Sequence, residues 1–209
     1  MARPIDRIEQ RKLTRGKLVD AALQLFSTSG YEHATVDDIS HEAGYSKGAY
    51  YFHFSTKDDI LLELLRMWTE ERSASLVRDE AAVMSPDQLR ETLTAFFSYA
   101  EAPRWPGVLL EFWAQAVRNP EVSKRLTQAY AAWRKEIAGA FEAAVQGGLR
   151  VESPADAASV VLAAHDGFAV QTAIGAPGGI ALSAADLADS IVAPLETAAQ
   201  PSTRRTIAM

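Results

Sequence analysis

The sequence contains no cysteine in its 209 residues, which excludes disulfides, thiolate zinc sites and cysteine nucleophiles. It also has no run of about 18 apolar residues that could span a bilayer, and no apolar signal core stands at its N-terminus. We therefore expect a cytoplasmic protein that does not associate with membranes.

Recognisable catalytic motifs are missing as well. The four histidines are scattered along the chain, and H-E-x-x-H, G-x-S-x-G and a phosphate-binding loop are absent. The sequence therefore predicts no enzyme activity, no catalytic residues, no cofactor and no metal site. A small α-helical enzyme is an alternative with almost no support.

Apolar residues instead recur at helical spacing along the chain. The periodic segments are separated by capping residues, glycines and prolines, and no strand-like alternation of apolar and polar residues occurs. We predict an all-α fold of about nine helices. The first is expected to be firm from about Leu13, because Gly16 weakens its start.

One stretch, residues 35–57, has the order of a helix-turn-helix. Thr35 and Asp38 form a capping box at the start of a short helix, which ends at Gly44 because glycine adopts a positive φ without strain. Ser46 caps a second short helix, and a further box at residues 55–58 opens a long third helix. In this motif the second helix lies in the DNA major groove.

The second helix carries hydrogen-bond donors and no acidic residue. Gly48 leaves the helix N-terminus open to a phosphate, Lys47 can reach guanine acceptors, and the Ala49 methyl suits a thymine methyl. Phe52 and Phe54 are expected to fill a small core, and Tyr50 either joins them or faces the DNA. The alternative is that the three helices only pack around their aromatic residues.

Many positions between residues 7 and 65 follow a single pattern, carried by Arg15, Leu18, Ala21, Ala22, Leu25, Phe26, Gly30, Thr35, Ile39, Ala43, Gly44, Ser46, Gly48, Tyr51, His53, Phe54, Lys57 and Leu61. With these residues the segment resembles the N-terminal domain of the TetR/AcrR family of transcriptional regulators. The resemblance implies DNA contacts from Thr35, Ser46, Lys47, Gly48, Ala49, Tyr51, His53 and Lys57. Tyr45 and Tyr50 depart from the family pattern and can add base or phosphate contacts, so both join the predicted DNA-binding residues.

The distribution of charge agrees with a DNA-binding N-terminus. The net charge is −6, but residues 1–17 hold six basic and only two acidic residues. We therefore expect DNA to meet a locally positive surface. The basic lead-in is either an arm that orders on DNA or a solvated tail.

These features predict two domains and a C-terminal tail. A helix-turn-helix DNA-binding domain occupies residues 1–57, with a basic arm at residues 1–12. A helical effector-binding and dimerisation domain follows at residues 58–198, and residues 199–209 form a flexible tail.

The last two helices are apolar on more than one face and rich in small residues. Pairing with a second copy would cover this surface in a four-helix interface with twofold symmetry. The predicted dimer-interface residues are Val161, His165, Phe168, Leu187, Ile191 and Leu195. A homodimer predicts a near-palindromic operator in double-stranded DNA; the alternative is a monomer whose last helices cover their own core.

The second domain has a heavy aromatic content, and helical bundles build ligand sites from apolar walls and a few polar groups. The predicted ligand-binding residues are Trp68, Phe97, Trp105, Phe112, Trp113, Tyr130, Trp133, His165, Phe168 and Gln171. For each ring the alternative is simple core packing. His165 and Asp166 should point about 100° apart on a helix, so we expect no acid/base pair from them and expect one to face the dimer partner.

The sequence thus predicts a homodimeric DNA-binding transcriptional regulator. We expect a repressor that a small, mainly apolar or aromatic/cationic effector releases from its operator. The second half has a faint similarity to the ligand domains of the betaine/choline branch of the same family. The main alternative is a constitutive or architectural DNA-binding dimer without an effector.

Overall fold

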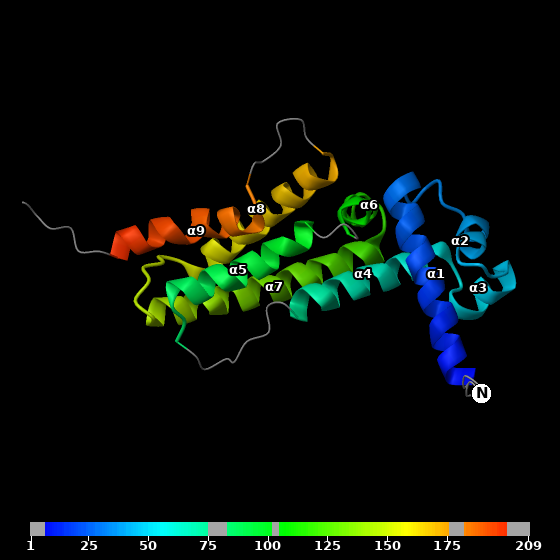
Figure 1. Ribbon diagram of the computed structural model, residues 1–209, viewed down its shortest axis with the longest axis horizontal. Helices are drawn as coiled ribbons and strands as arrows, with labels where there is room; N and C mark the ends of the chain where they lie inside the picture. Colours follow the sequence, from blue (N-terminus) through cyan, green and yellow to red (C-terminus); the bar gives the residue numbers. More distant parts are fainter. Residues whose placement is uncertain (1–6, 75–82, 102–104, 176–181, 200–209) are drawn as a thin grey trace, which may run out of the picture. The chain divides into compact units, whose positions relative to one another are not determined.

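The computed structural model describes residues 7–74, 83–101, 105–175 and 182–199, and every regular element within them is a helix. The all-α prediction is therefore confirmed. The helices in these ranges are α1 (Arg7–Ser29), α2 (Val36–Glu42), α3 (Lys47–His53), α4 (Lys57–Ala74), α5 (Pro86–Glu101), α6 (Pro106–Ala116), α7 (Pro120–Gln146), α8 (Pro154–Ala173) and α9 (Ala184–Ala199) (Figure 1). None of these described helices is long and apolar enough to cross a membrane.

The chain forms two compact units, and their limits differ from the predicted domains. The first unit comprises Met1–Glu71 and Ala102–Gln128, and the second comprises Arg72–Glu101 and Ala129–Met209. The change of unit therefore falls inside α4 and α7, not at residue 57. The first unit includes α6 because that helix packs closely on α1. A Cβ atom at Gly107 would stand 2.8 Å from the Ser27 carbonyl oxygen, so glycine permits this approach.

The core of the first unit follows the predicted apolar stripes. In α1 the buried side chains include Leu18, Ala22 and Phe26, and Ile39 of α2 is also fully enclosed. The basic lead-in differs from the prediction. The part of the predicted arm that the structure describes, residues 7–12, is the first part of α1. The helix is therefore regular well before Leu13, with Gly16 inside it.

The capping box of α4 lies one residue later than predicted. The Asp59 amide donates to the Thr56 hydroxyl at 3.2 Å, and the Thr56 amide donates to the Asp59 carboxylate at 2.9 Å. The Ser55 amide also donates to Asp59, at 2.9 Å. Asp58 is occupied elsewhere, because its carboxylate accepts from the Tyr31 hydroxyl and from the Asn119 side chain.

This shift can be tested with two neighbouring variants. Thr56→Ala removes a cap acceptor and should lower the free energy of unfolding by about 1 kcal/mol, whereas Ser55→Ala should leave it within about 0.5 kcal/mol of the wild type. Urea unfolding followed by circular dichroism measures both. Equal losses in the two variants would contradict the position of the box.

In the second unit, α9 packs along α5, and α8 also contacts α5 (Figure 1). Arg90 links α5 to α9, because its guanidinium donates to Asp189 at 2.8 Å and to the Glu196 carboxylate. The hydroxyls of Ser85, Ser153 and Ser183 cap α5, α8 and α9, since each accepts a hydrogen bond from the backbone amide three residues later. Pro194 lies inside α9 without ending it, and Ala199, the first residue of the predicted tail, is helical; residues 200–209 are outside the described residues.

Candidate nucleic-acid interface

Two caps and one glycine fix the geometry of α2 and α3. The Asp38 amide donates to the Thr35 hydroxyl at 3.1 Å, and the Thr35 amide donates to the Asp38 carboxylate at 3.0 Å, as the capping box predicts. Gly44 has a φ of 74°, in the left-handed region that favours glycine. The Ser46 hydroxyl then accepts from the Ala49 amide at 3.3 Å and starts α3.

The two faces of α3 have different environments. Tyr50 is completely buried, packs against Phe54 with ring centroids 5.7 Å apart, and donates its hydroxyl to the Thr56 carbonyl at 2.9 Å. The opposite face, with Lys47 and Tyr51, is exposed. Burial also raises the pKa of the Tyr50 hydroxyl. The predicted DNA contact from Tyr50 is therefore wrong, because its side chain has no free surface and anchors the helix from below.

A second correction concerns Phe52, which was expected in the small core. Its side chain is 63% exposed, and the guanidinium of Arg11 stands 4.8 Å from the centre of its ring. Arg15 lies in the same way over Phe54, at 4.9 Å. The basic residues of α1 therefore lie beside α3, where they add positive charge to the exposed face.

Lys47 and His53 mark the two ends of α3. The Lys47 ammonium bonds the Asp37 carboxylate of α2 at 2.9 Å, and this hydrogen bond raises its pKa. Burial, with the nearby charges of Arg11 and Arg15, lowers the pKa of His53. The imidazole of His53 is therefore neutral at neutral pH and can still donate one N–H to a phosphate.

Lys57 is engaged within the protein. Its ammonium donates to the carbonyls of Tyr31 and Ala34 at 2.6 and 3.0 Å, and it lies 4.2 Å from the centre of the Tyr31 ring. It holds the loop between α1 and α2 in place. These bonds give Lys57 a structural role in addition to the phosphate contact that the sequence predicts, and that contact stays a prediction.

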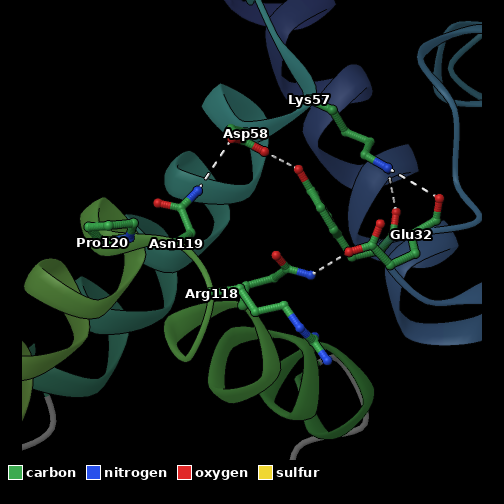
Figure 2. A pocket seen from close by; sticks show the side chains of 8 residues that line it. Glu32, Lys57, Asp58, Arg118, Asn119 and Pro120 are labelled. Atoms are coloured by element: carbon green, nitrogen blue, oxygen red, sulfur yellow. Dashed lines mark hydrogen bonds between the residues drawn. The ribbon is translucent and has the colours of Figure 1, made fainter.

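The same loop borders an open cavity of about 530 Å³, whose lining residues are Tyr31, Glu32, Lys57, Asp58, Gln115, Arg118, Asn119 and Pro120 (Figure 2). Gln115 of α6 donates to Glu32 at 3.1 Å, and Asn119 donates to Asp58 at 3.3 Å. These bonds join the α1–α2 loop to α6, and the start of α4 to the turn before α7. No local pattern in the sequence predicts this polar cavity, because its residues come from three separate segments of the chain.

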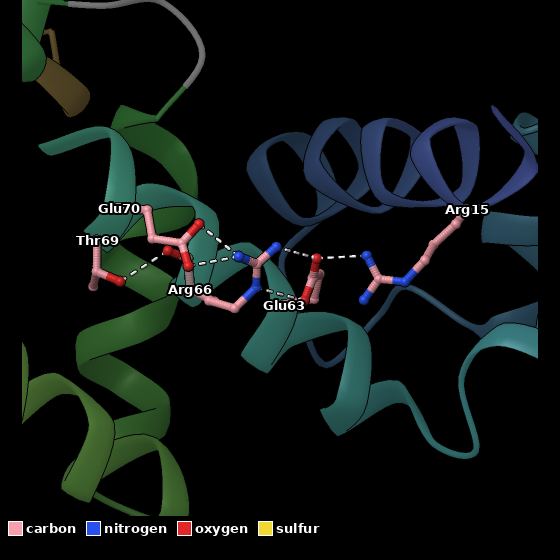
Figure 3. Close-up of polar contacts among 5 residues, drawn as sticks. All are labelled: Arg15, Glu63, Arg66, Thr69 and Glu70. Carbon is pink, nitrogen blue, oxygen red and sulfur yellow. Dashed lines mark hydrogen bonds and ion pairs between the residues drawn. The ribbon is translucent and has the colours of Figure 1, made fainter. Parts of the chain in front are cut away.

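Glu63 joins α1 to α4. Its carboxylate, 9% exposed as a residue, accepts from Arg66 at 2.7 Å and from Arg15 at 2.5 Å (Figure 3). Hydrogen bonds from Arg66 and Arg15 lower its pKa to about 2. Arg66 also reaches Glu70 one turn later, at 2.5 Å. Arg15 therefore serves the internal framework as well as the basic surface.

The ten predicted ligand-binding residues belong to different units. Trp68, Trp105, Phe112 and Trp113 belong to the first, whereas Phe97, Tyr130, Trp133, His165, Phe168 and Gln171 belong to the second. In the first unit Trp68 packs against Phe112 with ring centroids 5.7 Å apart, and the Trp105 indole donates to Glu71 at 2.9 Å. In the second unit Gln171 is exposed and Tyr130 is half-buried, whereas the other four side chains are buried in the core.

His165 and Asp166 do interact, contrary to the expectation from helix geometry. The His165 Nδ1 atom lies 3.2 Å from the Asp166 carboxylate, which also accepts from the Tyr130 hydroxyl at 2.5 Å. Successive residues of a helix point about 100° apart, but rotation about the side-chain bonds still lets the Asp166 carboxylate come within 3.2 Å of its neighbour.

Three of the predicted dimer-interface residues are unavailable for a partner. Val161, His165 and Phe168 are at most 5% exposed within one protomer, because this face of α8 covers the core of its own unit. Leu187, Ile191 and Leu195 are half-buried. The exposed side of α8 is a different stripe, formed by Val160, Ala163, Gly167, Gln171 and Ile174.

A capped glycine turn followed by an exposed, acid-free helix defines a helix-turn-helix protein. Residues 18–64 match bacterial regulatory proteins of the tetR family, and residues 86–195 match the C-terminal domain of BetI-type transcriptional repressors. The chain belongs to the TetR family of transcriptional regulators, and it is a regulator, not an enzyme.

Three relatives illustrate the range of similarity. The HTH-type transcriptional regulator BetI of Brucella canis is 29% identical over 202 residues, which cover 94% of this chain and 98% of that protein. The HTH-type regulator YwcC of Bacillus subtilis is 34% identical over 110 residues, 46% of this chain and 47% of that protein. A transcriptional regulator from Saccharomonospora viridis, solved in complex with choline, shares the fold with a TM-score of 0.71 at 24% identity, covering 87% and 95% of the two chains.

Proposed function

We propose that the protein is a ligand-responsive repressor that binds a near-palindromic operator as a homodimer and leaves it when a small effector binds the helical domain. The exposed face of α3, with Lys47 and Tyr51 on a helix anchored by buried Tyr50, carries this proposal. A second helix held in this way is the part of a helix-turn-helix that enters the major groove.

The residues of this interface divide into two roles. Lys47 and Ala49 lie at the N-terminal end of α3, where side chains reach base edges. Tyr51 and His53 can donate to phosphates, which set the register of the protein on the duplex. The other predicted contacts are Thr35, Tyr45, Ser46, Gly48 and Lys57.

A variant of Lys47 tests the base contact. With an operator selected from a random duplex library, Lys47→Ala should lose about 1–3 kcal/mol of discrimination at one base pair of each half-site. Fluorescence anisotropy against single-base operator variants measures this loss. Lys124→Ala, which removes an exposed lysine of α7, is the control and should leave discrimination unchanged. Unaltered discrimination at every position in Lys47→Ala would assign the base contact elsewhere.

The exposed stripe of α8 supports the homodimer. The apolar side chains of Val160 and Ile174 are 59% and 60% exposed. Ala163 and Gly167, which lie between them in the sequence, are small enough to let a second helix approach closely. A twofold axis through this stripe would pair two such helices, and a symmetric dimer carries two copies of α3, as a near-palindromic operator requires.

The effector step rests on the family and on the aromatic content of the helical domain. The Saccharomonospora viridis neighbour holds choline, which agrees with a small effector that the sequence predicts to be mainly apolar or aromatic/cationic. Such coupling requires the effector to bind better to a form that fits DNA poorly, typically by 1–3 kcal/mol. Titrating effectors against a labelled operator tests it: an effector that binds the protein without changing operator affinity would contradict induction.

The alternative of a constitutive DNA-binding dimer has one observation in its favour. Phe97, Trp133 and His165 are each at most 1% exposed, as expected of a filled interior. The two functions differ in the same titration, because a constitutive dimer keeps its operator affinity with every ligand.

A further inference from the structure

Arg72 occupies an unusual place in the second unit. The residue is only 1% exposed, and its guanidinium carbon lies 3.9 Å from the centre of the Phe96 ring and 4.6 Å from that of the Trp133 ring. Both rings are themselves buried. Aromatic faces that enclose a cation in this way are the usual binding site of quaternary ammonium ions. Here the enclosed cation belongs to the chain itself.

The polar contacts of Arg72 define the protonation of its neighbours. Its Nη1 atom lies 2.6 Å from Nε2 of His165. Because an arginine is always protonated and can only donate, Nε2 must accept, and the His165 proton must sit on Nδ1, facing Asp166 at 3.2 Å. Burial and the charge of Arg72 lower the pKa of His165 to about 4, in agreement with a neutral ring.

The cluster is closed around this arrangement. The His165 ring stacks on Phe97 with an angle of 12° between planes and lies 5.2 Å from Phe96. The Trp133 indole donates to the Ser73 hydroxyl at 3.1 Å, next to Arg72 in α4. A second cation that entered between Phe96 and Trp133 would have to displace the guanidinium and would meet its charge at short range.

We propose that Arg72 determines the specificity of the helical domain by filling, as an internal cation, the aromatic box that an ammonium ligand would need. The box is formed by Phe96 and Trp133. The protein therefore does not bind quaternary ammonium ions at this site, and an effector that binds this cluster is neutral or anionic. This inference rests on the proposed function, and it excludes a cationic effector from this cluster.

Three variants test whether the box is occupied. Arg72→Ala vacates it, Arg72→Met keeps it filled without charge, and Arg134→Ala removes an exposed arginine of α7 next to Trp133 as the matched control. Thermal unfolding is measured with choline chloride or guanidinium chloride at low millimolar concentration, with sodium chloride at equal ionic strength as the reference. Tryptophan fluorescence gives a second readout.

Choline and guanidinium should stabilise Arg72→Ala saturably, with binding at least about tenfold tighter than to the wild type, to Arg72→Met or to Arg134→Ala. If Arg72→Ala is unfolded alone, either cation should refold it. Saturable choline binding at this site in the wild type, equal cation binding by the Met variant, or an Ala variant that neither cation binds or refolds would each overturn the proposal. None of these measurements uses DNA, so a failure of induction leaves their outcome unaffected.

Discussion

Replacing Tyr50 by alanine is expected to unfold the helix-turn-helix at ordinary temperature. The side chain is fully buried under α3 and contacts the rings of Tyr51 and Phe54. Removing a buried aromatic side chain costs about 3–5 kcal/mol, a large part of the stability of a domain of this size. Tyr50→Phe keeps the ring and loses only the bond to the Thr56 carbonyl, so it should cost about 1 kcal/mol. Urea unfolding followed by circular dichroism measures both.

The neighbouring tyrosine provides the matched control. Tyr51 is 51% exposed, and Tyr51→Ala should leave the free energy of unfolding within about 0.5 kcal/mol of the wild type. Its operator affinity should nevertheless fall about tenfold, because a phosphate donor is lost. Tyr50→Phe should bind the operator normally. Lost sequence preference in Tyr50→Phe, or unchanged affinity in Tyr51→Ala, would reverse the roles assigned to the two residues.

Local signals in the sequence were sufficient for the helices and their ends. Caps at Thr35 and Ser46 depend on residues within one turn, and the positive φ of Gly44 depends on that residue alone. Even here, the box at the start of α4 was misplaced by one residue. Both Asp58 and Asp59 can act as the box partner, and the distant Tyr31 and Asn119 decide between them by engaging Asp58.

Contacts between distant segments of the chain could not be predicted from the sequence. From the sequence alone, Tyr50 and Tyr51 are equally able to face DNA. Only the packing of α3 shows that Tyr50 is buried and Tyr51 is exposed. The position of Arg72 is not predictable from the sequence, because a lone arginine near the end of a long helix gives no sign that Phe96 and Trp133 will enclose it. The prediction of interface residues on α8 was wrong for the same reason: the helix is apolar on more than one face, so its periodicity does not show which face packs on its own core.

The stability of the second unit should depend on pH through His165. Its pKa is lowered from 6.5 to about 4 in the folded protein. Below pH 6.5 the imidazole of His165 binds a proton in the unfolded chain but stays neutral in the folded protein. Burial and the charge of Arg72 disfavour the imidazolium more than Asp166 stabilises it. The free energy of unfolding is therefore unaffected by His165 above about pH 6.5. It decreases as the pH drops toward 4, by up to about 3 kcal/mol.

His165→Gln is the variant that isolates this effect, because its amide oxygen can still accept from Arg72 and no longer titrates. The unfolding free energy of the variant should change much less than that of the wild type between pH 6.5 and 5, whereas His33→Gln, at an exposed position, should keep the full slope. Glu63, whose pKa is about 2, loses its stabilising ion pairs only as the pH falls from about 4.5 toward 2. The two groups therefore act in separate windows, and parallel curves for the wild type and His165→Gln above pH 5 would show that His165 is not held neutral.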